Sequence, residues 1–341
     1  MSIATQELEK TIAELTAPGK GILAADESAG TIEKRLKAVN VASTEETRRD
    51  YRELLFSTPR LGGFISGVIL FEETLKQKNA AGVPFPELLK AQGIVPGIKV
   101  DKGTMSLPGF PGETVTQGLD GLAQRLGEYK QLGARFAKWR AVIHIGAGIP
   151  TPQAIAANAH ALACYAAICQ EQALVPIVEP EVLMDGDHTL ATSARVTEEV
   201  LHAVFHALHL QRVALEYMIL KPNMVEPGRT CPEPVTPQQV AQATLICLRC
   251  TVPAAVPGIN FLSGGQSEAT ATANLQALNA TAEKQPWGLS FSYGRALQAS
   301  VLRAWHGEAA NKSIAQQTLL KRARLNSAAV QGKYTAVMES E

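Results

Sequence analysis

The sequence predicts a closed barrel of eight parallel strands, each followed by a helix. Eight short apolar runs, rich in β-branched residues, alternate with longer segments of helical period. Parallel neighbours need a crossover long enough to contain a helix, so this repeated order predicts parallel strands. No Gly-rich dinucleotide loop follows the first run, which disfavours the alternative, a doubly wound sheet. We therefore expect an α/β protein with a single (β/α)8 TIM barrel, which takes roughly 250 residues and leaves room for extensions.

The predicted strands are the apolar runs themselves, each bounded by turn-forming residues. In chain order they are Gly21–Ala25, Phe64–Leu70, Gly97–Val100, Phe136–Val142, Val175–Glu179, Met218–Lys221, Gly258–Leu262 and Leu289–Ser292. The helical segments between the later strands are Gln153–Gln172, Thr197–Leu210 (opened by Thr197-Glu198-Glu199), Pro237–Arg249, Ser267–Ala280 and Arg295–Gly307.

The two ends of the chain are expected to extend the barrel domain. Residues 1–19 predict an N-terminal helix that Pro18 and Gly19 end, and residues 332–341 predict a short flexible tail. Gly and Pro are scattered as turn signals and do not gather into a linker. We therefore expect one domain over residues 1–341.

Composition narrows the class of protein. Lys plus Arg and Asp plus Glu both total 32, so no net field attracts nucleic acid or an anionic membrane. The apolar runs fall short of the roughly 18 residues that a membrane span requires. The odd number of cysteines, five, and an N-terminus unlike a signal or transit peptide indicate a reducing compartment. We expect a cytoplasmic protein with no nucleic-acid partner and no membrane association.

Charged residues occupy strand positions that should be apolar in a buried parallel sheet. Residues two apart on a strand face the same side, so each pair can point into the barrel mouth. The charged pairs are Lys99 and Asp101, Lys138 and Arg140, and Glu179 and Glu181, while Asp26 and Lys221 close two further runs. Such residues can form structural ion networks, but catalytic residues of barrels come from these same strand ends.

Two lysines among carboxylates supply what imine chemistry requires. An amine must be neutral to attack a carbonyl, and a second cation together with partial desolvation lowers the pKa of a lysine. Lys138 and Lys221 provide such a pair. Asp26, Glu179 and Glu181 can then transfer protons.

Two glycine-containing loops predict a phosphate site. Phe261–Ser267 ends the seventh strand with Ser263, Gly264 and Gly265 and opens a helix, so backbone N–H groups and the helix dipole can face an anion. Ser290–Arg295 repeats the device after the eighth strand and adds a guanidinium. Barrel enzymes often bind phosphate between these two loops. Lys34 and Arg35, which follow Asp26-Glu27-Ser28, could hold a second phosphate across the mouth.

Five motifs resemble the class I fructose-bisphosphate aldolases over about residues 1–335. They are Gly21–Ser28, Phe136–Arg140, Val178–Glu181, Leu220–Met224 and Phe261–Ser267. The resemblance implies reversible cleavage of fructose 1,6-bisphosphate to dihydroxyacetone phosphate and glyceraldehyde 3-phosphate, in glycolysis or gluconeogenesis. It also implies sugar-phosphate substrates, no cofactor, no metal and a homotetramer.

The resemblance further implies roles for individual residues. Lys221 matches the Schiff-base lysine, and Glu179 the acid/base that dehydrates the carbinolamine. Asp26 matches the group that handles the C4 hydroxyl proton, with Lys138 and Glu181 as neighbours that tune and orient the lysine. The implied substrate-binding residues are Ser263, Gly264, Gly265, Ser292, Gly294 and Arg295 at one phosphate, Arg35 and Lys99 toward the other, and Ser28 and Arg140 in the pocket.

The C-terminal tail departs from the family pattern. Family members commonly end in a tyrosine that assists proton transfer at C3, whereas this chain continues for seven residues beyond Tyr334, its last tyrosine. The tail is therefore not expected to supply a catalytic group.

Two further patterns are interpreted as structural, the first as a surface or interface helix and the second as packing within an apolar helix. His202, His206 and His209 share a helical segment without the intervening Glu of a zinc protease motif, so a surface or interface helix is favoured. Cys247 and Cys250 have metal-ligand spacing but no second pair.

The remaining alternatives for the whole chain are a metal-dependent aldolase, another Schiff-base barrel such as a transaldolase or deoxysugar aldolase, and a catalytically idle scaffold.

Overall fold

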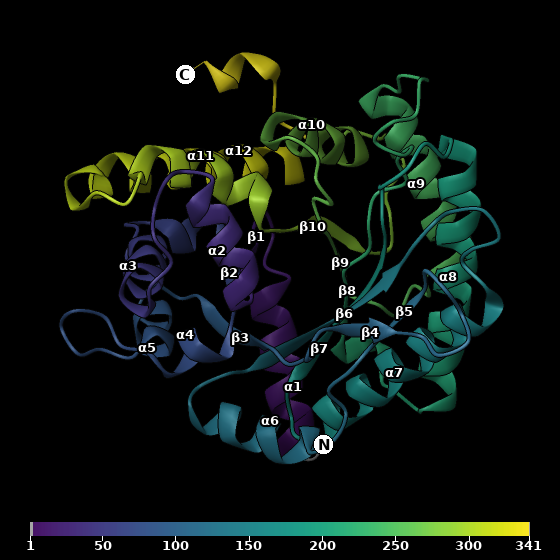
Figure 1. The fold of residues 1–341 in the computed structure, drawn as a ribbon, viewed down its shortest axis with the longest axis horizontal. Helices are drawn as coiled ribbons and strands as arrows, with labels where there is room; N and C mark the ends of the chain where they lie inside the picture. The colour runs from purple at the N-terminus through teal and green to yellow at the C-terminus, as the bar shows by residue number, and fades with distance from the viewer. Residues whose placement is uncertain (1–2, 341) are drawn as a thin grey trace.

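Eight parallel strands close into a barrel at the centre of the molecule (Figure 1). This computed structural model describes residues 3–340; Met1, Ser2 and Glu341, at the outer ends of the predicted helix and tail, lie outside the described residues. The strand order is β1-β10-β9-β8-β7-β6-β3-β2, and β2 pairs with β1 to close the barrel. The barrel strands are β1 (Gly21–Ala25), β2 (Ile65–Leu70), β3 (Val95–Lys99), β6 (Phe136–Ile143), β7 (Val175–Val182), β8 (Ile219–Leu220), β9 (Gly258–Phe261) and β10 (Gly288–Tyr293). Each predicted run coincides with one of them, so the predicted barrel is confirmed.

The helices that follow the later strands start at polar residues that cap them. Thr151 before α7, Thr236 before α9 and Ser267 before α10 each accept a hydrogen bond from a backbone N–H of the first turn. These helices are α7 (Pro152–Glu171), α8 (Leu190–Leu210), α9 (Pro237–Thr251), α10 (Glu268–Asn279) and α11 (Arg295–Trp305). The predicted start of α8 at Thr197 is wrong. The helix begins at Leu190, because the hydroxyl of Thr189 caps it by accepting from the N–H of Thr192 at 3.2 Å.

Five further helices lie between β1 and β6, and three 3-10 turns lie at different points of the chain. They are α2 (Ala29–Lys37), α3 (Glu45–Phe56), α4 (Glu72–Lys76), α5 (Phe85–Lys90) and α6 (Leu122–Gln131), with 3-10 turns η1 (Leu61–Gly63), η2 (Leu215–Tyr217) and η3 (Ala309–Asn311). An antiparallel hairpin of β4 (Thr104–Ser106) and β5 (Thr114–Thr116), which sequence analysis does not single out, follows β3. Within residues 3–340, no helix has the length and apolar character needed to cross a membrane.

The N-terminal helix α1 (Ile3–Leu15) closes one end of the barrel. Leu8, Ile12 and Leu15 belong to one apolar cluster with inward-facing strand residues such as Phe136. The ring of Phe136 lies so close to β3 that a Cβ on Gly97 would approach it to 2.3 Å. The interior is therefore filled with apolar side chains at the amino ends of the strands, and charged residues lie at the carboxyl ends.

The chain ends with α12 (Lys312–Val330), which packs on α10 and α11, and a tail that includes η4 (Ala336–Glu339). Sequence analysis does not single out α12. In the tail, Glu339 forms an ion pair with Arg322 of α12 at 2.6 Å, and the Tyr334 hydroxyl donates to Glu339 at 3.0 Å. Figure 1 shows this end of the chain beyond α10 and α12. The flexibility of the tail stays a prediction.

Candidate active site

Inward-facing side chains change from apolar to charged along β6 and β7. On β6, Phe136 lies in the apolar cluster closed by α1, whereas Lys138 and Arg140 face the open end. On β7, Ile177 gives way to Glu179 in the same manner. The period of two follows from strand geometry. The charged members line a cavity of about 1040 Å³ at the carboxyl ends of the strands.

Four charged residues form a continuous chain at the base of this cavity. The Nζ of Lys221, directly after β8, lies 3.1 Å from Oε1 of Glu179 on β7. The other oxygen of Glu179 lies 2.7 Å from Nζ of Lys138 on β6, which also donates to Oδ2 of Asp26 at 2.9 Å. Four strands thus bring two ammonium groups and two carboxylates into one network.

The two lysines differ in how readily they lose a proton. Burial lowers the pKa of Lys221, and the nearby ammonium of Lys138 lowers it further against the opposing effect of Glu179. Burial also acts to lower the pKa of Lys138, but Asp26 and Glu179 outweigh it and raise that pKa. Lys138 is thus held as a cation, and Lys221 is the lysine more readily converted to the neutral amine.

Both carboxylates of the network are held in the ionised form. Burial acts to raise the pKa of Glu179 and of Asp26, but Lys138 and then Lys221 overcome it, and both pKa values are lowered. Glu179 exposes only 4% of its side chain, so its charge is stabilised by these lysines and not by water.

Glu181 and Arg140 form a second ion pair, one step closer to the open end. Nε of Arg140 donates to Oε2 of Glu181. Glu181 was expected to help orient Lys221, but within residues 3–340 it makes no direct hydrogen bond to that lysine. Lys99 likewise pairs with Asp101, whose Oδ1 lies 2.6 Å from its Nζ. These two ion pairs thus surround the central network with charged side chains that line the cavity.

The loop after β9 presents unpaired donors to the cavity. Ser263 and Gly264 line it, and Gly264 and Gly265 have φ of +51° and +104°, which favour glycine. The backbone N–H groups of these three residues find no acceptor within residues 3–340. Ser267 then caps α10, so the helix N-terminus directs its positive dipole to the same region. This loop can bind an anion through backbone donors.

The loop after β10 adds a hydroxyl and a guanidinium. Ser292 is buried, and its hydroxyl has no hydrogen-bond partner among the described residues. Gly294 and Arg295, at the start of α11, also line the cavity. The guanidinium of Arg295 forms no ion pair with any residue of 3–340. Because β9 and β10 are neighbours, the two loops can contact a single anion together.

Arg35 is the one predicted residue that lies on a different side of the mouth from that expected. It was expected opposite the β9 and β10 loops, but it pairs with Glu27, and its Nη2 would lie 3.8 Å from a Cβ on Gly294. The reason is that β1 pairs with β10 when the barrel closes. Lys99 does lie opposite, because β3 stands four strands from β9 in the ring of eight. Ser28, after β1, also lines the cavity.

Some residues of the site were not predicted. Glu27 is buried and pairs with both Arg35 and Arg52, so it fixes the start of α2. Its position directly after Asp26, at the carboxyl end of a predicted strand, could have identified Glu27 as a residue of the site. The guanidinium of Arg229 lies on the β9 loop. Arg229 belongs to an irregular connection without periodicity, so no sequence pattern identifies it as a residue of the site. Of the predicted site residues, all but Gly265 line the cavity.

The histidine and cysteine patterns lie away from the cavity. His202, His206 and His209 are exposed on α8. Cys247 is buried on α9 and Cys250 is exposed. In the part of the chain that the structure describes, no three His, Cys, Asp or Glu side chains gather as they would around a metal ion.

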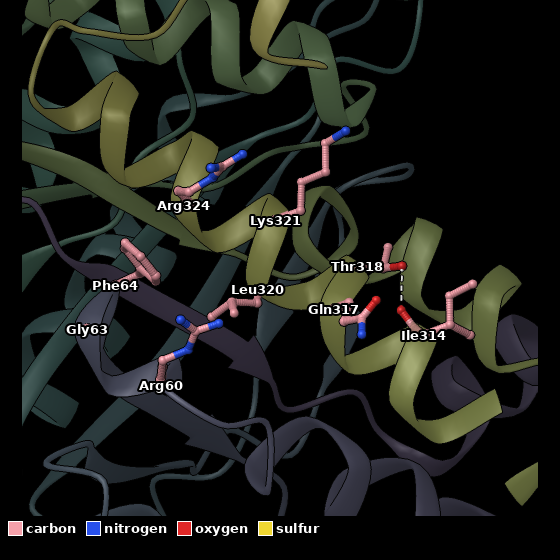
Figure 2. Close-up of a pocket in the computed structure, with 9 residues that line it drawn as sticks. All are labelled: Arg60, Gly63, Phe64, Ile314, Gln317, Thr318, Leu320, Lys321 and Arg324. Carbon is pink, nitrogen blue, oxygen red and sulfur yellow. Dashed lines mark hydrogen bonds between the residues drawn. The ribbon is translucent and has the colours of Figure 1, made fainter. Parts of the chain in front are cut away.

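A second pocket, of about 590 Å³, lies near the amino end of β2 and against α12 (Figure 2). Its residues are mainly basic, polar or aliphatic, and none belongs to the predicted site. They are Arg60, Gly63, Phe64, Ile314, Gln317, Thr318, Leu320, Lys321 and Arg324. With no carboxylate among these residues, the pocket lacks the acid/base pairing of the barrel mouth.

Comparison with known proteins gives consistent matches over almost the whole chain. The family model described as "Glycolytic: Fructose-bisphosphate aldolase class-I" matches residues 7–341. A probable fructose-bisphosphate aldolase class 1 of Xylella fastidiosa is 54% identical over 97% of this chain and 99% of its own. Fructose-bisphosphate aldolase 1 of Toxoplasma gondii is 56% identical over 97% and 92%. The fructose-bisphosphate aldolase of Plasmodium falciparum, solved with TRAP and a small molecule inhibitor, superimposes with a TM-score of 0.97 at 53% identity, covering 98% of this chain and 97% of that one.

Proposed function

The chain belongs to the class I fructose-bisphosphate aldolases, and on that premise we propose that Lys221 forms the Schiff base through which it cleaves fructose 1,6-bisphosphate. The products are dihydroxyacetone phosphate and glyceraldehyde 3-phosphate. The observation that carries the assignment is the buried Glu179 carboxylate between two lysines, with one oxygen 3.1 Å from Nζ of Lys221 and the other 2.7 Å from Nζ of Lys138. Burial and the neighbouring ammonium of Lys138 lower the pKa of Lys221, which agrees with its role as the nucleophile.

The first step is addition of the neutral Lys221 amine to the C2 carbonyl of the open-chain sugar. Glu179 at 3.1 Å takes a proton from the Lys221 ammonium, and the low exposure and the neighbouring cation favour the neutral amine that results. After the amine adds to C2, the extra proton on its nitrogen moves to the C2 oxygen and gives the carbinolamine. The carbinolamine then loses its hydroxyl as water, with Glu179 returning the proton. The result is a protonated imine between Lys221 and C2.

The second step breaks the C3–C4 bond. Asp26 is held as a carboxylate by Lys138 at 2.9 Å and can accept the proton of the C4 hydroxyl. The C4–O electrons form the aldehyde of glyceraldehyde 3-phosphate, and the C3–C4 pair moves into the imine to give an enamine. Protonation of the enamine at C3 and hydrolysis of the imine release dihydroxyacetone phosphate and free Lys221.

Donor and cationic groups on opposite sides of the mouth support a bisphosphate substrate. The loops after β9 and β10 offer backbone donors, Ser292 and Arg295 on one side, and Lys99 lies opposite. The network of Lys221, Glu179 and Lys138 lies between them. A substrate anchored at both ends is held with its carbonyl over Lys221, which reduces the entropic cost of the first step.

Variants of the two lysines, together with a choice of substrates, test this assignment. Lys221→Met should abolish cleavage of the bisphosphate, while the circular dichroism spectrum keeps its folded form. Comparison of kcat/KM for fructose 1,6-bisphosphate and fructose 1-phosphate then tests the opposite subsites, since the bisphosphate should be strongly preferred. Residual cleavage in Lys221→Met above that of Lys138→Met would reject Lys221 as the nucleophile.

We also propose that the chain is a single-domain, cytoplasmic protein that assembles as a homotetramer. The support is the resemblance to the family and the reduced state expected of the five cysteines. Light scattering after size-exclusion chromatography tests the assembly, for which a mass near four times 36.4 kDa is expected and a monomer mass would contradict it.

A further inference from the structure

Arg229 lies against the loop proposed to bind substrate phosphate, in the connection from β8 to α9 that begins with Lys221. Its Nη2 donates to the backbone carbonyl of Gly264 at 3.3 Å. A Cβ on Gly265 would lie 2.0 Å from the same nitrogen. The guanidinium therefore rests on Gly265, and only glycine at this position leaves room for it.

The position of Arg229 is fixed by the neighbouring connection from β7 to α8. Its backbone N–H donates to the carbonyl of Met184 at 2.8 Å, and Thr230 N–H donates to Gly186 at 3.0 Å. Asp185 adds an ion pair, with Oδ1 3.4 Å from Nε of Arg229. Asp185 also lines the main cavity. Arg229 is thus anchored by its own backbone, although 43% of its side chain is exposed.

The hydrogen bond to Gly264 has a directional consequence for the loop. In a trans peptide the C=O and the following N–H point in opposite directions. By holding the Gly264 carbonyl toward itself, Arg229 turns the N–H of Gly265 to the other side. It also offsets the partial negative charge of a carbonyl oxygen that would otherwise repel an anion nearby.

Arg229 also adds positive charge where other arginines converge. Burial lowers the pKa of Arg295, and the charges of Arg35 and Arg229 lower it further. Arg295 is therefore close enough to each of these two guanidinium groups to be repelled by it. An anion bound beside Arg295 would relieve that repulsion.

We propose that Arg229 is a positioning residue for the phosphate-binding loop after β9: it holds the Gly264 carbonyl away from the bound phosphate and raises affinity without taking part in bond cleavage. This inference rests on the proposed function, since it assumes that the phosphate of the substrate binds at Ser263, Gly264 and the adjoining loop. Interactions made equally with substrate and transition state change KM and leave kcat nearly unaltered.

The experiment compares Arg229→Ala and Arg229→Lys with the wild type. We expect Arg229→Ala to raise both the KM for fructose 1,6-bisphosphate and the Ki of inorganic phosphate about tenfold, the effect of about 1.4 kcal/mol of binding free energy. The kcat should stay within about threefold. Arg229→Lys, which keeps the charge and one donor for Gly264, should recover both constants to within about threefold of wild type.

Two further variants show whether the effect is local. Asp185→Asn loosens Arg229 without touching the loop and should raise both constants in the same direction by a smaller factor. Arg195→Ala removes an exposed arginine whose ion pair to Glu199 has the same length, 3.4 Å, on α8, and should leave both constants within about twofold. Unchanged KM and Ki in Arg229→Ala, or a fall in kcat alone, would overturn the proposal.

Failure of this inference can be told apart from failure of the proposed function. Borohydride reduction with dihydroxyacetone phosphate is performed on the wild type and on Arg229→Ala. An adduct on Lys221 in both, together with unchanged phosphate affinity, rejects only the role of Arg229. Absence of the adduct in the wild type rejects the proposed function itself.

Discussion

Replacing Glu179 with glutamine removes the carboxylate that lies between the two lysines of the barrel mouth. Its two oxygens lie 3.1 Å from Lys221 and 2.7 Å from Lys138. A glutamine of the same shape has one acceptor oxygen, so one lysine loses its acceptor and faces an N–H group instead. Lys221 also loses the charge that favours its protonated form. Addition of the amine should therefore persist, and the loss should fall on dehydration of the carbinolamine.

The magnitude follows from the proton transfer that is lost. General acid–base catalysis contributes about 10²–10⁴-fold, which corresponds to about 2.7–5.4 kcal/mol of activation free energy. The proposed phosphate contacts do not involve Glu179. The Glu179→Gln variant should therefore lower kcat by about 10²–10⁴-fold and change KM by less than about threefold.

Steady-state cleavage coupled to reduction of the triose phosphate products measures both constants. Glu113→Gln serves as the matched control: this buried carboxylate accepts from the backbone and hydroxyl of Thr151 at 2.7 and 2.6 Å and lies outside the cavity. Its kcat should stay within about twofold of wild type. A kcat for Glu179→Gln within tenfold of wild type, or an equal loss in Glu113→Gln, would refute the reasoning.

Three other predictions concern metal dependence, pH and the tail. Dialysis against EDTA should leave cleavage within about twofold, because the protonated imine is the electron sink; activity that disappears and returns with zinc would contradict this. Burial raises the pKa of Glu226 to about 8 from its ordinary value of 4.5. Between these two pH values the folded state keeps a proton that the unfolded state has lost. The contribution of Glu226 to the free energy of unfolding should therefore fall as pH rises from 4.5 to 8. Tm is measured for the wild type and for Glu226→Gln at pH 5.5 and pH 8.5. Between these pH values the Tm of the wild type should fall relative to that of the variant. The same Tm difference at both pH values would contradict this prediction. Deleting residues 335–341 should change the rate of cleavage less than about threefold, since no residue of 332–340 lines the cavity. The deletion should lower Tm, because it removes the Arg322–Glu339 ion pair. A tenfold loss of turnover with borohydride trapping intact would show that the tail is catalytic.

The barrel and its centre could be predicted because both leave periodic signals. Buried parallel strands read as continuous apolar runs, and each predicted run became a strand. Charges two apart, as at Lys138 and Arg140, then marked the strand ends that face the cavity. The helix α12 left a weaker signal, because it buries Arg322, Asn326 and Ser327 between its neighbours and lacks a clear apolar stripe.

Contacts that depend on barrel closure could not be predicted from local pattern. Arg35 follows β1, and it lies beside Gly294 only because the first and last strands of the barrel pair. Arg229 reaches the β9 loop from an irregular connection held by backbone hydrogen bonds to another connection. The start of α8 was misplaced because Thr197-Glu198-Glu199 resembles a helix start, whereas Thr189 supplies the cap.

The central claim is that Lys221 forms the covalent bond to the substrate. Dihydroxyacetone phosphate is added to the wild type, the imine is reduced with borohydride, and peptide mass spectrometry locates the modified lysine. Nζ of Lys138 lies 2.7 Å from one oxygen of Glu179 and Nζ of Lys221 lies 3.1 Å from the other, so the two lysines are direct competitors in this measurement. We predict a stable adduct on Lys221 that is absent from Lys221→Met. An adduct on Lys138, or no adduct on either lysine, would contradict the account.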